Sequence, residues 1–261
     1  MEIYDSLLKA VHDEYDTLRV LKKSARGEVS LVRHRESGTR YIFRHFEGSS
    51  EVYQLLLGLS CRNLPQIMEV GEKDGRTALL EEYVQGDTLG EILEGGVLTT
   101  GQAKQIGRQL CSALWVLHSR GIVHRDVKPD NVILRDSEAV LIDFDASRIH
   151  KTAISEDTKI LGTTGFAAPE QFGDSKGKGL YNTDIRADIY GIGTTMYYLK
   201  TAKTYNSVPD SKSLYSFKDY FKTSHKLRKI IKKCTRNNPD LRYQSCIEIL
   251  CSIKTLHIIG K

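Results

Sequence analysis

A polar segment at residues 124–131 reads HRDVKPDN, and a further aspartate, Asp143, follows twelve residues after it. Asp126 and Asp143 offer carboxylates, Lys128 offers an ammonium group and Asn131 offers an amide. Transfer of a phosphoryl group needs an acceptor for the proton of the attacking hydroxyl, a cation near the moving group and oxygen ligands for Mg2+. These four side chains therefore predict phosphoryl transfer, with Asn131 and Asp143 as the magnesium ligands.

The same eight residues match the pattern H-R-D-x-K-x-x-N at every fixed position. On this motif the chain resembles the eukaryotic-type (Hanks-type) serine/threonine protein kinases, and the phrase GFAAPEQFG at 165–173 looks especially like bacterial members. The resemblance implies that ATP is the donor, used with Mg2+, and that a serine or threonine of a protein substrate is the acceptor. Thr163, together with Lys128, resembles the serine/threonine class, so the resemblance adds Thr163 to the catalytic residues.

Two later features extend the resemblance over about residues 15–255. The segment DIYGIG at 188–193 matches a buried helix whose aspartate, Asp188, holds the backbone of the catalytic loop in the family. Arg242 stands where the family pairs an arginine with the glutamate of Ala-Pro-Glu, here Glu170. Hydroxyls between 152 and 163 are candidates for autophosphorylation, with Arg125 as the partner of the added phosphate; they also suit an ordinary exposed loop.

Residues 21–46 alternate apolar and polar side chains in runs joined by turns, which predicts a β-meander after an amphipathic helix at 3–17. In the family this region carries a glycine-rich loop over the nucleotide phosphates. Aligned on Gly27 and Val29, the first two glycine positions hold Lys22 and Ser24, so only the third glycine is present.

The position of the family's phosphate-contacting lysine is occupied by Arg44, fifteen residues after Val29. A guanidinium can bind phosphate in bidentate fashion, but it is longer and planar, so the exchange is not conservative. Either Arg44 performs this task, or Lys22 or Lys23 reaches in from the loop, or nucleotide binding is weak. Glu51, at the start of a short helical pattern capped by Ser49 or Ser50, is the candidate partner for the cation.

The run TALLEEYVQGDTL at 77–89 resembles the strand and hinge that receive adenine. The resemblance implies that the backbone of Glu82 and Val84 bonds the adenine edge, and that Glu81 guards the back of the pocket. A buried carboxylate there must be protonated or find a cation, and Arg44 is the nearest one that the fold supplies. We therefore hypothesise that Glu81 and Arg44 occur together because each offsets the cost of burying the charge of the other. The adenine-lining side chains expected from the family are Leu21, Val29, Ile42 and Ile133.

Asp143 opens a tripeptide that reads Asp-Phe-Asp where the family has Asp-Phe-Gly. The loss of glycine restricts the backbone, although aspartate tolerates left-handed conformations better than most residues. Asp145 is interpreted as a turn residue, with a further oxygen near the metal as the alternative.

Two other classes of function remain as alternatives. A pseudokinase that binds nucleotide or a partner would explain the missing lysine, the missing glycines and the altered tripeptide. A small-molecule phosphotransferase would explain the phrase IDFD at 142–145, but such enzymes lack the Ala-Pro-Glu segment and a counterpart of Arg242.

The length of 261 residues fits one two-lobed domain or two small ones. The resemblance implies a single α+β domain with a bilobal, protein-kinase-like fold: a small antiparallel lobe (about 1–82) with one short helix, a hinge (about 82–86) and a larger, mainly helical lobe (about 87–261). A long amphipathic helix from Thr99 to Leu117 leads to the catalytic loop.

No apolar run approaches the roughly 18 residues that span a bilayer. The five cysteines lack the spacing of a metal site, which indicates reduced thiols and a cytoplasmic location. The net charge of +5 is mild, so nucleic acid is not an expected partner. Oligomeric state is not indicated by the sequence.

Overall fold

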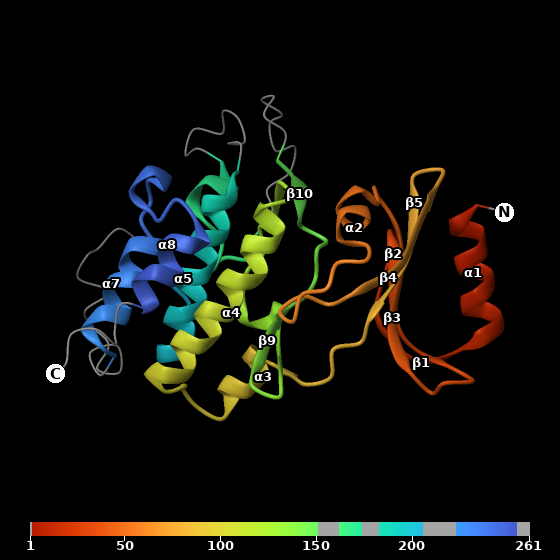
Figure 1. Cartoon of the computed structure of the whole chain (residues 1–261), viewed down its shortest axis with the longest axis horizontal. Helices are drawn as coiled ribbons and strands as arrows, with labels where there is room; N and C mark the ends of the chain where they lie inside the picture. Colours follow the sequence, from red (N-terminus) through yellow and green to blue (C-terminus); the bar gives the residue numbers. More distant parts are fainter. Residues whose placement is uncertain (1, 151–161, 174–182, 206–222, 255–261) are drawn as a thin grey trace. The chain divides into compact units, whose positions relative to one another are not determined.

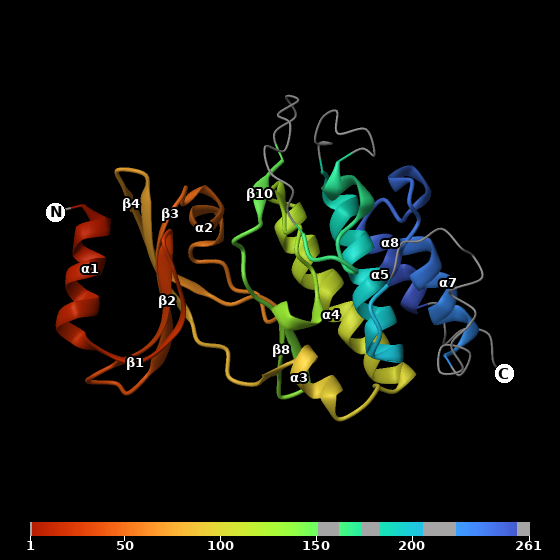
Figure 2. The same ribbon diagram turned by 180° about the vertical axis from the view of Figure 1, so that it is seen from behind.

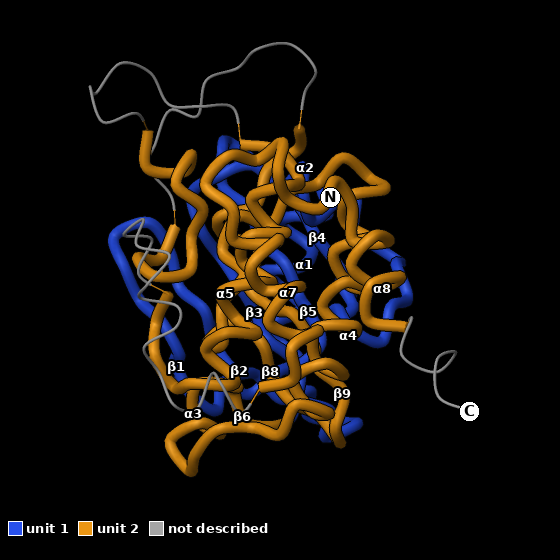
Figure 3. The backbone as a smooth tube through the Cα atoms, turned by 90° about the vertical axis from the view of Figure 1, so that its left-hand side faces the viewer, with its two compact units in different colours: residues 1–85 blue, residues 86–261 orange. Residues whose placement is uncertain are grey.

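The chain divides into two compact units, residues 1–85 and 86–261 (Figure 3). The computed structural model describes residues 2–150, 162–173, 183–205 and 223–254. The first unit holds an antiparallel sheet with two helices, and the second is mainly helical. The predicted α+β class is therefore confirmed. The boundary between the units falls within residues 82–86, the segment in which the sequence analysis expects a hinge.

The first unit is built on a five-stranded sheet in the order β1-β2-β3-β5-β4. All neighbouring pairs are antiparallel, and the strands comprise β1 (Tyr15–Ser24), β2 (Gly27–His34), β3 (Arg40–Glu47), β4 (Ile67–Lys73) and β5 (Arg76–Glu82). The helix predicted at 3–17 is α1 (Ile3–Glu14), which ends earlier because Tyr15 already pairs with His34 in the sheet. The edge strand β1 is irregular at two points, and Leu21 is the extra residue at the second one.

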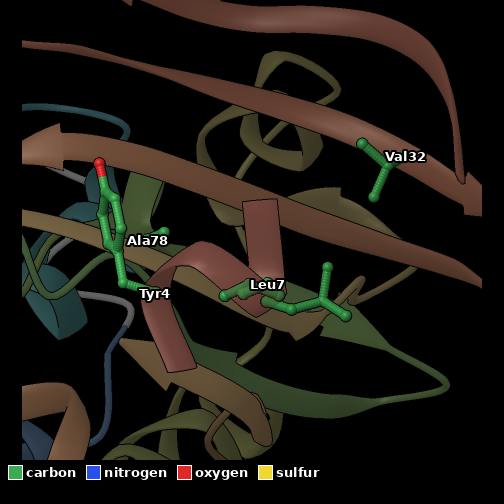
Figure 4. Close-up of a cluster of buried hydrophobic side chains, with 5 residues drawn as sticks. Tyr4, Leu7, Val32 and Ala78 are labelled. Carbon is green, nitrogen blue, oxygen red and sulfur yellow. The ribbon is translucent and has the colours of Figure 1, made fainter. Parts of the chain in front are cut away.

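The two faces of this sheet carry different elements. Helix α1 covers one face, where Tyr4 and Leu7 form a buried cluster with Val32, Ala78 and Leu80 (Figures 1 and 4). Helix α2 (Glu51–Leu56) lies on the other face, where Tyr53 contacts the ring of Phe46 on β3. Side chains alternate along a strand, so Arg44 and Ile42 share the face of Phe46 and point away from α1.

Close approach of backbones explains two glycines in this unit. A Cβ on Gly27 would lie 2.4 Å from the carbonyl oxygen of His45, so the β2–β3 contact itself requires glycine there. At Gly71 a Cβ would lie 2.5 Å from the backbone nitrogen of Tyr4. The absence of a side chain at Gly71 therefore allows α1 to pack directly on β4. Gly27, the one glycine of the family's loop pattern that this chain retains, is therefore also required by the packing of β2 against β3.

The second unit combines small sheets with a set of packed helices. Its strands form a three-stranded sheet in the order β6-β8-β9 and a two-stranded pair, with bounds β6 (Asp87–Thr88), β7 (Ile122–Val123), β8 (Val132–Arg135), β9 (Glu138–Leu141) and β10 (Arg148–Ile149). Its helices are α3 (Leu89–Glu94), α4 (Thr100–His118), α5 (Ile185–Thr201), α7 (His225–Cys234) and α8 (Cys246–Lys254). Short 3-10 turns complete it: η1 (Pro129–Asn131), η2 (Pro169–Phe172) and η4 (Pro239–Leu241). Figure 2 shows α4 and α5 at the centre of this group, with α8 and α7 beside them.

Helix α4 confirms the helix predicted from Thr99 to Leu117. Thr99 occupies the N-cap and forms a reciprocal capping box with Gln102. The predicted apolar positions are buried, from Ala103 to Leu117. Of the described helices, none is long and apolar enough to cross a membrane.

The short helix expected to start at Glu51 is α2, which ends at Leu56. Ser50 occupies its N-cap but its side chain makes no capping bond. Instead, Ser49 Oγ accepts a hydrogen bond from the backbone nitrogen of Glu51 at 3.2 Å. The expected serine cap is therefore supplied by the earlier of the two serines.

Candidate functional site

Three side chains of the second unit, those of Lys128, Asn131 and Thr163, converge on the carboxylate of Asp126. Lys128 Nζ lies 2.7 Å from Asp126 Oδ2, and the Thr163 hydroxyl donates to Oδ1 at 2.9 Å. Asn131 Nδ2 donates both to Oδ2 and to the backbone carbonyl of Asp126, each at 2.9 Å. Lys128 Nζ also donates to Thr163 Oγ1 at 2.7 Å, which closes a ring of polar contacts. The side chains of Asp126 and Lys128 each remain 17% exposed, so the cluster is ordered but open to a reactant.

The backbone of the catalytic loop is held by Asp188, on the buried helix α5. Its two carboxylate oxygens accept hydrogen bonds from the backbone nitrogens of His124 (2.9 Å) and Arg125 (2.7 Å). Arg125 has a φ of 67°, a left-handed conformation that is strained for a residue with a side chain. Gln171 Nε2 further binds the carbonyl of Arg125 at 2.7 Å. The loop conformation is thus imposed by its surroundings, and the predicted role of Asp188 is confirmed.

His118 completes this anchor at the last turn of α4. Its Nε2 lies 2.8 Å from Asp188 Oδ2, and its side chain is 8% exposed. Burial disfavours the charged ring, but the hydrogen bond to Asp188 outweighs it and raises the pKa of His118 to about 9. The imidazole is therefore cationic near neutral pH, and it compensates the fully buried carboxylate of Asp188, whose pKa is held below its usual value despite burial.

His124, the first residue of the catalytic loop, has a fully buried ring. It meets the ring of Phe144 edge to face, with centroids 5.6 Å apart. Burial lowers the pKa of His124, and the carboxylates of Asp188, Asp143 and Asp126 act in the opposite direction. The ring is thus a neutral, structural group, and both Asp126 and Asp143 are close enough to influence its pKa.

The tripeptide Asp143-Phe144-Asp145 forms a tight turn without glycine. Asp143 has a φ of 68°, which is a left-handed conformation. Asp145, which is also described, does not have a positive φ. The backbone nitrogen of Asp145 donates to Asp143 Oδ1 at 3.2 Å, an Asx-type contact. An aspartate at 145 therefore imposes no left-handed strain, and the turn interpretation of this residue agrees with its position.

Asn131 and Asp143 offer the oxygen chemistry that Mg2+ prefers. Both hydrogen bonds of the Asn131 amide to Asp126 use Nδ2, so Oδ1 is the atom suited to a metal. The backbone links the two residues, since the nitrogen of Ile142 donates to the carbonyl of Asn131 at 2.9 Å. Within the described residues there is no group of three or more His, Cys, Asp or Glu that could hold a metal by itself. The donor set fits an ion that keeps water and phosphate oxygens as its other ligands.

In the first unit, Arg44 and Glu81 form a buried ion pair across β3 and β5. Arg44 Nε donates to Glu81 Oε1 at 2.8 Å, and the two side chains are only 9% and 6% exposed. The sequence hypothesis required such a contact, because an unpaired carboxylate at this position would be costly to bury. The pairing of Arg44 with Glu51 stays a prediction; Glu51 is exposed in the first turn of α2.

The register separates the two lysines proposed as replacement cations. Lys22 is opposite Val29, which in turn is opposite Arg44, so these three side chains share one face of the sheet. Lys23 is opposite Glu28 and bonds to it at 3.0 Å, on the face that α1 covers. Of the two lysines, only Lys22 shares a face with Arg44.

The remaining predicted nucleotide-binding residues belong to both units. Ile42 and Val29 are half-buried on the face of Arg44, and Leu21 is 42% exposed on the edge strand. The backbone nitrogen of Glu82 donates to the carbonyl oxygen of Gln66 at 2.8 Å. Val84 is buried near the end of the first unit, and Ile133 is half-buried on β8 of the second. Their joint role stays a prediction.

Sequence reasoning missed two residues of the site. His118 could have been noticed as a basic side chain in the last turn of a helix, next to its apolar stripe. Gln171 had no signal of its own, because its bond to Arg125 joins positions 46 residues apart. The predicted phosphoacceptors Thr152, Ser155 and Thr158 lie outside the described residues.

One further long-range pair was expected and is confirmed. Arg242 binds Glu170 in bidentate fashion, with nitrogen–oxygen distances of 2.6 and 2.7 Å. The Arg242 side chain is fully buried and also donates to the backbone carbonyls of Arg186, Arg236 and Asn237. This network fixes the Ala-Pro-Glu segment, which follows Thr163, to residues 236–242 and to the first turn of α5.

Comparison with known proteins agrees with this geometry. The sequence model of the protein kinase domain matches residues 15–255. Serine/threonine-protein kinase D of Synechocystis sp. is 34% identical over 220 residues, an alignment that covers 80% of this chain and 41% of that protein. PknA of Nostoc sp. is 27% identical, covering 91% of this chain and 46% of the relative. PknB of Mycobacterium leprae is 26% identical, covering 94% and 43% respectively.

This chain spans less than half the length of each of these three relatives. The match to the domain, however, extends over nearly all of its residues. The resemblance predicted from the catalytic-loop motif is confirmed, and the chain belongs to the protein kinase domain family.

Proposed function

We propose that this chain is an ATP- and Mg2+-dependent serine/threonine protein kinase, which transfers the γ-phosphoryl group of ATP to a protein hydroxyl. The observation that carries the proposal is the ring formed by Asp126, Lys128, Thr163 and Asn131. A domain used only for binding has no physical need for these groups in mutual contact. The three relatives named above are all serine/threonine-protein kinases, which supports the same class of reaction.

Each member of the ring has a distinct task in the proposed reaction. Asp126 orients the acceptor hydroxyl and takes up its proton as the oxygen attacks. Lys128, held by Asp126 and Thr163, brings positive charge to the transferring group. Thr163 fixes the positions of the other two, because its hydroxyl accepts from Lys128 and donates to Asp126.

Asn131 and Asp143 are the residues that would hold magnesium. When bound, the ion neutralises phosphate charge and orients the nucleotide. Asn131 is directed by its bonds to Asp126, so the metal ligand and the proton acceptor are coupled in one rigid turn. Asp143 is held beside this turn through the backbone bond from Ile142 to Asn131.

Nucleotide binding in the first unit is assigned to the sheet face opposite α1. The proposed contacts are the backbone of Glu82 and Val84 with the adenine edge, and Arg44 with the phosphates, with Glu51 supporting the cation. The apolar residues Leu21, Val29, Ile42 and Ile133 would line the base, with Gly27 in the loop above the phosphates.

The acceptor is proposed to be a serine or threonine of a protein, with autophosphorylation between 152 and 163 as one use of the site. All five cysteines are free thiols, four of them buried or half-buried, which supports the proposed reducing, cytoplasmic setting.

Incubation with γ-labelled ATP, Mg2+ and an acceptor protein tests the proposal. Label should appear with the wild-type chain and fall by at least about 1,000-fold in Asp126→Ala and Asp143→Asn, as loss of a catalytic group does in coupled sites. Asp136→Asn, on the turn between β8 and β9, is the control and should transfer label normally. Equal labelling by all four proteins would reject catalysis at this site.

A further inference from the structure

We propose that Glu81 is a positioning residue that orients the phosphate-binding guanidinium of Arg44 by holding its Nε. This inference rests on the proposed function, since it concerns the nucleotide site of that reaction. It makes Arg44 and Glu81 a single functional unit, in which loss of the guanidinium at position 44 or of the hydrogen-bond acceptor at position 81 is tolerated only with a matching change at the other position.

The strand register brings the two side chains together. Ile42 is directly opposite Glu81, and Arg44 is two residues further along β3, opposite Leu79. Residues two apart on a strand share a face, so Arg44 and Glu81 are diagonal neighbours on the face that α1 does not cover. Their contact of 2.8 Å is therefore built into the β3–β5 pairing and is not an accident of surface side chains.

The chemistry of the contact fixes the direction of the guanidinium. Glu81 binds Nε, the nitrogen nearest to the backbone. Because the guanidinium is planar and rigid, a bond at Nε sets the plane in which Nη1 and Nη2 lie. Those two nitrogens form the outer end of the side chain, which suits bidentate contact with phosphate oxygens.

A lysine at position 44 could not bind Glu81 with one nitrogen and the phosphates with others, as arginine can. Its donors all sit on one atom, at a reach that corresponds to the central carbon of the guanidinium rather than to its outer nitrogens. Buried beside the carboxylate of Glu81, the ammonium would be drawn to it and away from the phosphates, since opposite charges attract strongly where water is excluded. The family's lysine thus requires a neutral residue at position 81, whereas arginine makes use of a glutamate.

The direct test is a double-mutant cycle on the whole chain, with affinity for adenylyl imidodiphosphate plus Mg2+ measured by calorimetry, and KM for ATP and kcat measured separately. Arg44→Lys and Glu81→Leu should each weaken affinity and raise KM by about tenfold or more, within the range of coupling between residues in contact. The double variant Arg44→Lys/Glu81→Leu should return to within about threefold of wild type, because the lysine is released from the carboxylate. Glu81→Gln should also stay within about threefold, since its amide oxygen can still accept from Nε.

Two controls separate this inference from its alternatives. Arg33→Lys alters an exposed ion pair with Asp16 and should leave affinity unchanged. Lys22→Ala should change affinity less than Arg44→Lys does; the reverse order would assign the phosphate contact to Lys22 and overturn the proposal. Circular dichroism verifies folding, and Glu81→Gln with the double variant carries the test if Glu81→Leu does not fold.

Additive losses in the double variant, or a Glu81→Gln variant as weak as Glu81→Leu, would refute the positioning role. A different result would refute the proposed catalysis: the nucleotide analogue binds as described, but Asp126→Ala transfers phosphate as well as wild type does. A wild-type chain that does not bind the analogue would overturn both proposals.

Discussion

The ion pair between His118 and Asp188 predicts an unusual loss of stability at mildly alkaline pH. The pKa of His118 is raised from 6.5 to about 9 in the folded chain, because Asp188 holds the protonated ring although burial opposes it. A raised pKa means that the folded state retains a proton that the unfolded state releases. The resulting stabilisation is complete below pH 6.5 and is lost as the pH rises through about 9.

The size of this effect follows from the two pKa values. A difference of about 2.5 units corresponds to about 3 kcal/mol of stabilisation in total, and about 2 kcal/mol of it should disappear between pH 6.5 and pH 8.5. The lowered pKa values of His45 and His124 act in a different range, since such groups change stability below pH 6.5. The measurement window therefore isolates His118 from the other perturbed histidines.

Urea unfolding followed by far-UV circular dichroism, at steps between pH 6.5 and pH 8.5, measures the slope. In His118→Gln the side-chain amide can still donate to Asp188 but carries no titratable proton, so the curve should become flat over this window. His12→Gln, at an exposed position in α1, is the matched control and should keep the wild-type slope. A wild-type curve that is flat or rises with pH, or an unchanged slope in His118→Gln, would refute the charged pair at the loop anchor.

Three further predictions follow from single contacts. Thr163→Ala should lower kcat by up to about 100-fold through misplacement of Asp126 and Lys128, while Thr163→Ser should retain most activity; equal kcat in both would remove the positioning role. Arg242→Met should lower the free energy of unfolding by about 3–5 kcal/mol, because the half-buried carboxylate of Glu170 loses its bidentate partner; Glu248→Gln, at an exposed pair, serves as the control in the same urea titration. Leu7→Ala should cost about 3 kcal/mol by opening a cavity under α1 and lower the thermal midpoint, whereas exposed Lys9→Ala should not; similar midpoints would mean that α1 adds little to the first unit.

Local patterns predicted the elements whose burial follows their periodicity. The apolar positions of α4 recur at helical spacing and Thr99 precedes them, so helix, cap and buried face were all accessible from sequence. The same reasoning placed the end of the first helix too late. Tyr15 continues the helical pattern, but its ring contacts His34 and Tyr41 on neighbouring strands, and that pairing starts β1 immediately after Glu14.

The candidate site could be predicted only where a contiguous motif or a family pattern carried it. Residues 124–131 contain Asp126 and two of the three side chains that meet it, so the chemistry could be predicted from one segment. The residues that anchor the catalytic loop could not be predicted in this way, because His118 and Asp188 are 70 residues apart and no local pattern links them. Arg44 and Glu81 were paired by a physical argument, since a buried carboxylate demands a cation, and the choice of Nε as the contact atom needed the structure.

The most direct test of the central claim is phosphoryl transfer from labelled ATP to serine or threonine of an acceptor protein, compared between the wild-type chain and Asp126→Asn. Asparagine keeps the shape of the side chain and cannot accept the hydroxyl proton. We predict labelled phosphoserine or phosphothreonine with wild type, a loss of about 1,000-fold or more in the variant, and little change in nucleotide affinity. Undiminished transfer by Asp126→Asn would contradict the assignment of this carboxylate as the centre of the reaction.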